Sequence, residues 1–193
     1  MKRIILMVFR NLIWVPYGWF KLCWCAAHVD RYSEKERYEL LQYIDNRAIR
    51  GGNIKIEAYG LENIPKENGF MFFPNHQGLF DVLAILQVIK EVKEGRNYLI
   101  FAEGTRNKDK NRPHEFKGGS FKAATKSRCP IVPVALIDSY KAFDTRSIEK
   151  MVVQVHFLEP MYYDEYKDMK TTELALEVKT RIEETIKKSG KWD

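Results

Sequence analysis

Two side chains that can do acid–base chemistry stand five positions apart in the middle of the chain. His76 and Asp81 belong to Pro-Asn-His-Gln-Gly-Leu-Phe-Asp at 74–81, between an apolar run and a stretch with helical spacing. On one continuous helix the two side chains would point about 140° apart, so they meet only if His76 lies in a turn and Asp81 in the first helical turn. Asp81 would then hold one imidazole nitrogen and leave the other as a general base, which suits deprotonation of an alcohol. The alternative is a structural turn, in which Asn75 and His76 cap the helix and Asp81 complements its dipole.

A second cluster of polar residues follows the apolar run that ends at Phe101. The residues at 101–106 are Phe-Ala-Glu-Gly-Thr-Arg, and they come directly after a predicted buried strand, where α/β proteins place binding loops. Gly104 allows the backbone to come close to a ligand, and the planar guanidinium group of Arg106 fits a phosphate. The alternative is an ordinary turn with a solvated arginine. Both clusters in this order favour a functional site more strongly than either cluster does alone.

Strands and helices are predicted to alternate around these clusters. Ser33 and Glu36 have the spacing of a capping box and begin a helix that ends at Gly51-Gly52. Apolar residues recur every four positions from Leu174 to Ile186 and predict a terminal amphipathic helix. Hydrophobic spacing predicts strands at 54–58, 70–73, 98–101, 131–136 and 151–158, and helices at 82–94 and 119–126. This alternation predicts an α/β fold in which helices flank a mixed, largely parallel sheet.

The first thirty residues are predicted to form a separate, membrane-associated helical segment. They are mostly apolar, but Arg10, Pro16 and Lys21 interrupt them, whereas a spanning helix needs about 20 uninterrupted apolar residues. We therefore expect two short helices, near 4–14 and 17–28, that lie in the bilayer interface with their aromatic and basic side chains at headgroup depth. The alternative is a cleaved signal peptide, but an A-x-A-like cleavage site is missing. The predicted division is this segment at 1–30 and a globular domain at 31–193.

Composition narrows the classes of partner and ligand. The chain has 32 basic and 26 acidic side chains and a net charge of +6, which favours nucleic acid, an anionic membrane surface or a phosphorylated substrate. Its aromatic residues gather in the N-terminal segment and the predicted core strands rather than between basic residues, which argues against a nucleic-acid partner. The three cysteines lack metal-ligand spacing, so we expect reduced thiols and no metal.

The motifs and their order resemble those of the phosphate acyltransferase family, which includes the 1-acylglycerol-3-phosphate acyltransferases. Residues 75–81 match the family's Asn-His-x4-Asp block, and residues 101–106 match its Phe-Pro-Glu-Gly-Thr-Arg block, with Ala102 in place of the proline. Residues 131–134 match its later hydrophobic block with a proline, and residues 116–121 look like the family's segment between these two blocks. The resemblance covers most of the chain, from about 54 to 158.

The resemblance implies a fold and a set of site residues. The fold would be glycerol-3-phosphate acyltransferase-like, with an acyltransferase domain at 31–193. His76 would be the catalytic base and Asp81 its orienting partner. Pro133 would line the acyl or donor site. The residues that would bind the glycerol phosphate of the acceptor are Asn75, Glu103, Gly104, Thr105 and Arg106.

The resemblance also implies a reaction. The enzyme would transfer a fatty acyl group from acyl-CoA or acyl carrier protein to the sn-2 hydroxyl of 1-acylglycerol-3-phosphate, which is lysophosphatidic acid. The product would be phosphatidic acid, an intermediate of phospholipid biosynthesis. We expect direct transfer without a covalent enzyme intermediate and without a cofactor, at the cytoplasmic face of a membrane.

The chain departs from the family between the first two blocks. Only 22 positions separate Asp81 from Glu103, where the family normally inserts further elements and another arginine-containing substrate block. The helical run after Asp81 resembles two helices joined near Gln87. We therefore expect a depleted sheet, uncovered apolar surface on this helix, and weak or no activity. The alternative function is that of a weak or inactive lipid-binding relative at the membrane surface.

Overall fold

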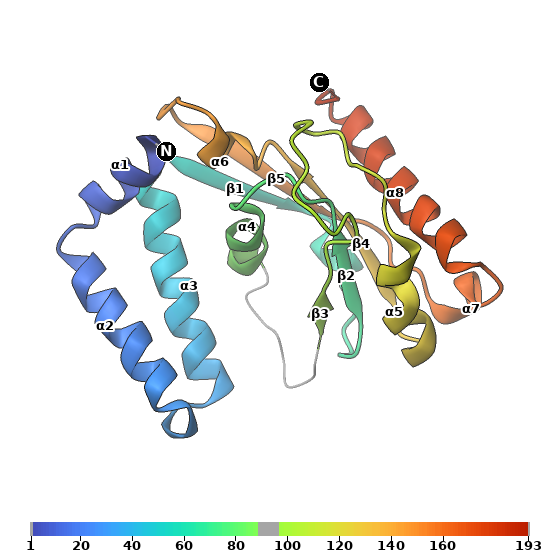
Figure 1. Cartoon of the computed structure of the whole chain (residues 1–193), viewed down its shortest axis with the longest axis horizontal. Helices are drawn as coiled ribbons and strands as arrows, with labels where there is room; N and C mark the ends of the chain where they lie inside the picture. The colour runs from blue at the N-terminus through green and yellow to red at the C-terminus, as the bar shows by residue number, and fades with distance from the viewer. Residues whose placement is uncertain (1, 89–96, 193) are drawn as a thin grey trace.

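The computed structural model describes residues 2–88 and 97–192, and a five-stranded sheet lies at the centre of these residues (Figure 1). The strand order is β1-β5-β4-β2-β3, and all neighbours are parallel except β4 and β5, which are antiparallel. The strands are β1 (Ile54–Tyr59), β2 (Met71–Pro74), β3 (Tyr98–Leu99), β4 (Ile131–Ile137) and β5 (Met151–Phe157). The predicted α/β fold with a mixed, largely parallel sheet is confirmed. The strand expected at 98–101 is shorter than predicted.

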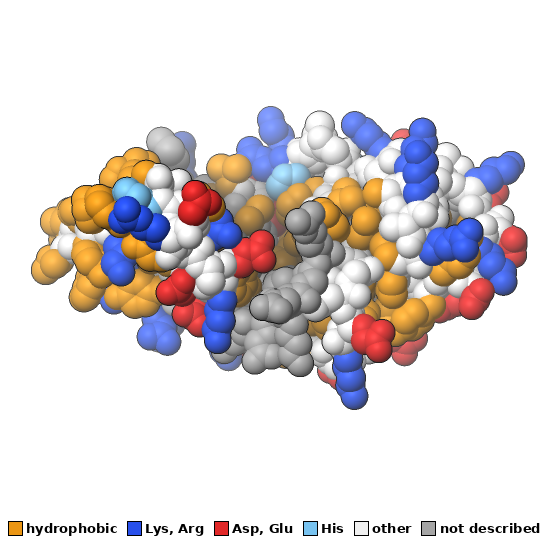
Figure 2. Space-filling model, turned by 90° about the horizontal axis from the view of Figure 1, so that it is seen from below, with side chains coloured by type: hydrophobic (Ala, Val, Ile, Leu, Met, Phe, Trp, Pro, Cys, Tyr) orange, Lys and Arg blue, Asp and Glu red, His pale blue; other side chains and the backbone are white. Residues whose placement is uncertain are grey.

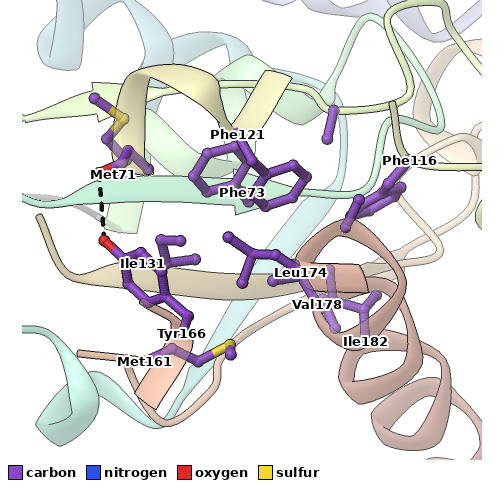
Figure 3. Close-up of a cluster of buried hydrophobic side chains, with 14 of the residues drawn as sticks. Met71, Phe73, Phe116, Phe121, Ile131, Met161, Tyr166, Leu174, Val178 and Ile182 are labelled. Carbon is purple, nitrogen blue, oxygen red and sulfur yellow. Dashed lines mark hydrogen bonds between the residues drawn. The ribbon is translucent and has the colours of Figure 1, made fainter. Parts of the chain in front are cut away.

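One face of the sheet is covered by the C-terminal helix α8 (Thr171–Lys188). Alternate residues of β4 point to opposite faces, so Ile131, Ala135 and Ile137 face α8. The side chains that recur every four residues from Leu174 to Ile186 are fully buried against them, which confirms the predicted amphipathic helix (Figure 3). Phe73 of β2 stacks on Phe121 in the same cluster, with ring centroids 4.2 Å apart.

The other face of the sheet is covered by α4 (Asp81–Val88) and α3 (Glu34–Gly51). Phe80 and Ile85 are buried against this face together with Ile49 of α3. Ala84 is also fully buried, whereas Val82 is 46% exposed, so the apolar surface of α4 that we expected to be uncovered is covered only in part. The rest of the helix predicted at 82–94 lies outside the described residues.

The two short helices predicted at the N-terminus are α1 (Lys2–Arg10) and α2 (Trp14–Ala27). Pro16 does not break a helix, because it lies in the first turn of α2, where its missing N–H would have no partner. Met7 of α1 is buried in the same cluster as Ile49, so α1 is part of the core although the predicted domain boundary excluded it. In the described residues, no helix combines the length and the apolar character that a membrane crossing requires.

A buried arginine fastens α1 to the rest of the molecule. The guanidinium group of Arg3 donates hydrogen bonds to the carbonyl oxygens of Glu149 and Ser147, at 2.9 Å each, and to that of Gly52. At Gly52 a Cβ atom would lie 2.3 Å from Cε of Met7, so glycine permits the close approach of α1 and α3. The segment predicted as a separate anchor is therefore partly built into the domain.

The shorter elements connect these layers. The predicted capping box at the start of α3 is confirmed, because Ser33 Oγ accepts from Glu36 N while Glu36 Oε2 accepts from Ser33 N. The helix predicted at 119–126 is split into a 3-10 turn and a short α-helix. These and the remaining elements are η1 (Val29–Arg31), η2 (Leu61–Asn63), η3 (Gly118–Phe121), α5 (Lys122–Ser127), α6 (Lys141–Asp144) and α7 (Tyr163–Tyr166).

Candidate active site

Both polar clusters lie beyond the carboxyl ends of neighbouring parallel strands. His76 follows β2 by two residues, and Phe101 follows β3 by two residues. The backbone of the two loops is joined directly, because Asn107 N donates to His76 O at 2.8 Å. The sheet topology therefore brings the two segments, about 25 residues apart in sequence, to one edge.

His76 and Asp81 form the contact that their spacing predicted. His76 lies in the turn after β2, Asp81 is the first residue of α4, and His76 Nδ1 lies 2.8 Å from Asp81 Oδ2. The carboxylate of Asp81 is fully buried, whereas the side chain of His76 is 21% exposed. Asp81 therefore fixes one ring nitrogen from inside the protein, and the imidazole keeps a solvent-accessible edge.

The carboxylate of Asp81 is held in place by three further donors. Its Oδ2 accepts hydrogen bonds from the backbone N–H groups of Gln77, at 2.7 Å, and Gly78, at 2.9 Å. The hydroxyl of Ser139, just beyond the end of β4, contacts Oδ1. These contacts restrict the position of the carboxylate and, through it, the orientation of the imidazole ring.

Phe101 restricts the imidazole from a second direction. Its ring stacks on that of His76, with centroids 4.1 Å apart and an angle of 26° between the planes. We did not assign this role from the sequence, although Phe101 opens the second motif. The ring of His76 is thus oriented by a carboxylate and by an aromatic face.

Both carboxylate oxygens of Glu103 accept hydrogen bonds from the backbone around the site. Its Oε1 accepts from the backbone N–H of His76 at 2.7 Å, and its Oε2 accepts from that of His114 at 3.0 Å. Burial raises the pKa of this carboxyl group above its ordinary value, and the hydrogen bonds from the two backbone amides oppose that effect. Glu103 is only 3% exposed, and its expected role in binding the acceptor stays a prediction.

Asn75 also has a structural position. Its side chain is fully buried, and its amide exchanges two hydrogen bonds with the backbone of Leu136 in β4, at 2.7 Å and 3.0 Å. These bonds tie the loop after β2 to the neighbouring strand and occupy both ends of the amide. In this structure the side chain of Asn75 therefore contacts the backbone of β4, and its expected role in substrate binding stays a prediction.

Pro133 lies inside the sheet rather than on a ligand-accessible surface. It is buried at the centre of β4 and pairs with Phe73 of β2. Because side chains alternate along a strand, Pro133 points to the face that α8 covers. The expected contact with an acyl chain or donor therefore has no support in the described geometry.

The other three expected acceptor ligands are exposed. Gly104 has φ +71°, a left-handed conformation that favours glycine, and Thr105 follows it on the same loop. Arg106 Nη1 lies 3.6 Å from Oδ1 of Asp144, the last residue of α6. The guanidinium group is about one-third exposed and therefore accessible to an anionic ligand.

Lys117 brings a second positive charge to this loop. A Cβ atom on Gly104 would lie 2.9 Å from Lys117 Nζ, so the ammonium group sits beside the exposed backbone of the loop. The backbone N–H of Lys117 also donates to the carbonyl of Ala102 at 2.9 Å. We did not select Lys117 from the sequence, and its only signal was its place in the segment 116–121.

A network of buried polar side chains links the turn after His76, the loop around Asn111 and the end of β4. Gln77 Nε2 donates to Asn111 Oδ1 at 3.0 Å, and Asn111 Nδ2 donates to Asp138 Oδ1 at 3.0 Å. Asn111 lies in a stretch at 107–115 that is rich in charged residues, which are mostly exposed in proteins. The structure instead buries this asparagine and uses it to fix the loop beneath the site.

A second histidine–aspartate pair shows what distinguishes the first. His114 Nε2 lies 2.7 Å from Asp109 Oδ2, also five positions apart, but the two side chains are 47% and 65% exposed. Asp109 lacks the buried donors that frame Asp81. In the described part of the chain, no three side chains of the metal-ligating types come together.

Two comparisons found similarity between this chain and known acyltransferases. The family model described as Acyltransferase matches residues 84–137, which include the Glu103–Arg106 loop and β4. No curated protein matches the sequence significantly. The fold is similar to the crystal structure of the 1-acyl-sn-glycerophosphate acyltransferase PlsC from Thermotoga maritima, with a TM-score of 0.76 and 19% identity over 98% of this chain and 96% of that chain. The family model thus matches part of the chain, including the Glu103–Arg106 loop, and the chain shares its fold with a solved acyltransferase.

Proposed function

We propose that this protein transfers a fatty acyl group from acyl-CoA or acyl carrier protein to the sn-2 hydroxyl of 1-acylglycerol-3-phosphate, forming phosphatidic acid. The observation that carries the proposal is the contact between His76 Nδ1 and Asp81 Oδ2 at 2.8 Å. The side chains of Arg106 and Lys117 bring two positive charges to the neighbouring loop. PlsC, which shares the fold, is a 1-acyl-sn-glycerophosphate acyltransferase, and this supports the same substrate class.

The proposed mechanism gives each nitrogen of His76 a role. Asp81 accepts a hydrogen bond from Nδ1–H, so the neutral ring has its lone pair on Nε2. Nε2 takes the proton from the acceptor hydroxyl as the oxygen attacks the thioester carbonyl. The tetrahedral intermediate then collapses, the C–S bond breaks, and the thiolate leaves. The imidazolium that forms is stabilised by the buried carboxylate of Asp81.

The acceptor phosphate would bind at Arg106 and Lys117. Arg106 supplies a planar pair of donors, and Lys117 supplies a compact charge beside the Gly104 backbone. Lys117 can replace the positive charge of the arginine block that we expected to be missing. A phosphate bound here would compete with Asp144 for Arg106, so the ion pair must open when the acceptor binds.

The membrane would be contacted by the N-terminal helices. Large hydrophobic side chains are exposed along α1, α2 and their connection, and Trp19 is 70% exposed. Figure 2 shows hydrophobic side chains gathered at the end of the molecule that these helices form. This surface supports a location in the bilayer interface, where a lipid acceptor is available. We propose that the protein lies at the cytoplasmic face of the membrane.

The test is an acyl-transfer assay with lysophosphatidic acid and labelled acyl-CoA or acyl carrier protein as donor. His76→Ala should lower kcat by about 10²–10⁴-fold, because the general base is lost. His114→Ala is the matched control, since it removes an exposed histidine with a similar aspartate partner, and it should leave kcat unchanged. Retained activity in His76→Ala would refute the mechanism.

The alternative is a weak or inactive lipid-binding relative. The observation that favours it is the edge strand β3, which lies between the two motifs in sequence and is only two residues long. A wild-type protein that binds lysophosphatidic acid but turns over neither donor would establish this alternative. Turnover that His76→Ala abolishes would exclude it.

A further inference from the structure

A groove between the α1–α2 connection and α3 has the composition of an anion site. Its volume is about 530 Å³, and it is lined by three arginines (Arg10, Arg47 and Arg50), two asparagines, a tyrosine and Gly51. None of the lining side chains is a carboxylate. The groove shares no residue with the site around His76, so acyl transfer does not account for it.

The neighbouring groove between α2 and α3 does not share this charge. It has a volume of about 430 Å³ and includes Lys21 together with two acidic residues, Glu36 and Glu39. The excess of positive charge is therefore particular to the arginine groove. The rest of this helical surface carries both signs.

The arginines are held by neutral partners. Arg47 Nε donates to Asn11 Oδ1 at 3.2 Å, and its guanidinium group lies 4.4 Å from the centre of the Trp14 ring. Arg10 Nη1 donates to Asn53 Oδ1 at 2.6 Å. Among the described residues, neither these two nor Arg50 forms an ion pair. Each guanidinium group has five N–H donors, so donors remain for a ligand.

The arginine groove borders the exposed apolar surface of the N-terminal helices. Arg10 and Asn11 are followed directly by Leu12 and Ile13, which are 62% and 87% exposed, and Phe9 precedes them at 73%. An anion in the groove would therefore lie beside side chains that favour hydrocarbon. A phospholipid has this combination, with a phosphate at one end and acyl chains at the other.

We propose that the arginine groove binds the phosphate of an anionic phospholipid headgroup at the membrane surface. The bound lipid is separate from the acceptor at Arg106, and it would hold the helices in the interface while the active site works on other molecules. The inference rests on the membrane association proposed above but not on turnover.

The test measures binding to vesicles of phosphatidylcholine with and without phosphatidylglycerol, at fixed ionic strength. Each arginine near an anionic surface contributes about 1 kcal/mol, which is about fivefold in affinity. Changing Arg10, Arg47 and Arg50 to Gln should therefore reduce the preference for anionic vesicles by about 100-fold. The control removes the same charge from the other end of the molecule, by changing the exposed lysines Lys126, Lys167 and Lys188 to Gln, and should keep most of the preference.

A second variant tests whether a loss of vesicle binding could come from a loss of structure. Arg47 stacks on Trp14, so its replacement could loosen α1 and α2, whereas Arg10 and Arg50 are exposed. Changing only these two should reduce the preference by about 25-fold without altering the helical circular dichroism. An unchanged preference in both groove variants, or an equal loss in the lysine control, would overturn the proposal.

Two further experiments test whether the groove binds free phosphate instead of a lipid, and whether it takes part in catalysis. Inorganic phosphate at millimolar concentration should not displace the protein from vesicles, and displacement would assign the groove to free phosphate instead. Activity toward lysophosphatidic acid in detergent micelles should be the same in wild type and in the groove variants. Loss of that activity would contradict a separate site, while an inactive wild type would refute the proposed function and leave the vesicle result standing.

Discussion

Asp45 of α3 should make the folded protein less stable as the pH rises, and Asp45→Asn should remove most of this effect. The carboxyl group is 4% exposed, and neither oxygen has a hydrogen-bond partner among the described residues. Burial without a partner disfavours the charged form and raises the pKa of Asp45 from 3.8 to about 7. The folded protein therefore holds a proton that the unfolded chain releases between about pH 4 and pH 7.

The sign and size of the effect follow from this difference in pKa. A folded-state pKa above the unfolded one gives stability that is complete below about pH 4 and is lost as the pH rises through about 7. Each tenfold change in proton affinity corresponds to about 1.4 kcal/mol, so the whole interval corresponds to about 4 kcal/mol. Between pH 5 and pH 8.5 the wild type should lose about 3 kcal/mol of its free energy of unfolding through this group.

The assay is urea unfolding, followed by tryptophan fluorescence in mild detergent, at several pH values from 5 to 8.5. The stability of Asp45→Asn relative to the wild type should increase by about 3 kcal/mol between pH 5 and pH 8.5, because asparagine never ionises. Asp168→Asn changes the charge at an exposed position and should follow the wild-type pH profile. Parallel profiles for wild type and Asp45→Asn would show that Asp45 is not the source and would refute the reasoning.

Other predictions concern the site and the membrane surface. Asp81→Asn should lower kcat by about 10⁴-fold by favouring the wrong tautomer of the base, and a small loss in kinetic assays would contradict its orienting role. Arg106→Ala should raise the acceptor KM, and Arg106→Lys should restore it only in part because the bidentate geometry is lost; an unchanged KM in both would place the phosphate elsewhere. Asp144→Asn should lower the acceptor KM with little change in kcat, since it removes the carboxylate that competes for Arg106, and a raised KM would disprove that competition. Replacing Trp19 and Phe20 by Ser should shift the protein from the membrane to the soluble fraction in sedimentation, and unchanged sedimentation would assign attachment to another surface.

The contact between His76 and Asp81 was predictable because it depends on local geometry. A turn followed by a helix start is the arrangement that lets residues five apart meet. The strands were predictable for a similar reason, since β4 is a run of apolar residues and the C-terminal helix has a regular four-residue spacing. The spacing of residues along the sequence was therefore enough to predict most of the fold and the contact between His76 and Asp81.

The roles of Asn75, Glu103 and Lys117 depended on contacts between distant segments. The sequence of a binding motif does not show whether a polar side chain contacts a ligand or the backbone of another segment. Asn75 turned out to bind the backbone of β4, and Glu103 to bind two backbone amides of other loops. Lys117 approaches Gly104 only because the chain folds back after residue 106. The packing of α1 was missed because Arg3 and Met7 lie in a run that also fits a membrane surface.

The bond from Glu103 to the backbone of His76 links substrate binding to proton transfer. Glu103, which accepts from the backbone N–H of His76, lies three residues before Arg106, the proposed phosphate ligand. A phosphate bound at Arg106 would therefore act on the peptide that positions the proposed base. Energetic coupling between such neighbours is expected to be non-additive. Acceptors that lack the phosphate should therefore lose turnover as well as affinity. If the acceptor phosphate binds at Arg106 as proposed, its binding and the alignment of the imidazole would occur together.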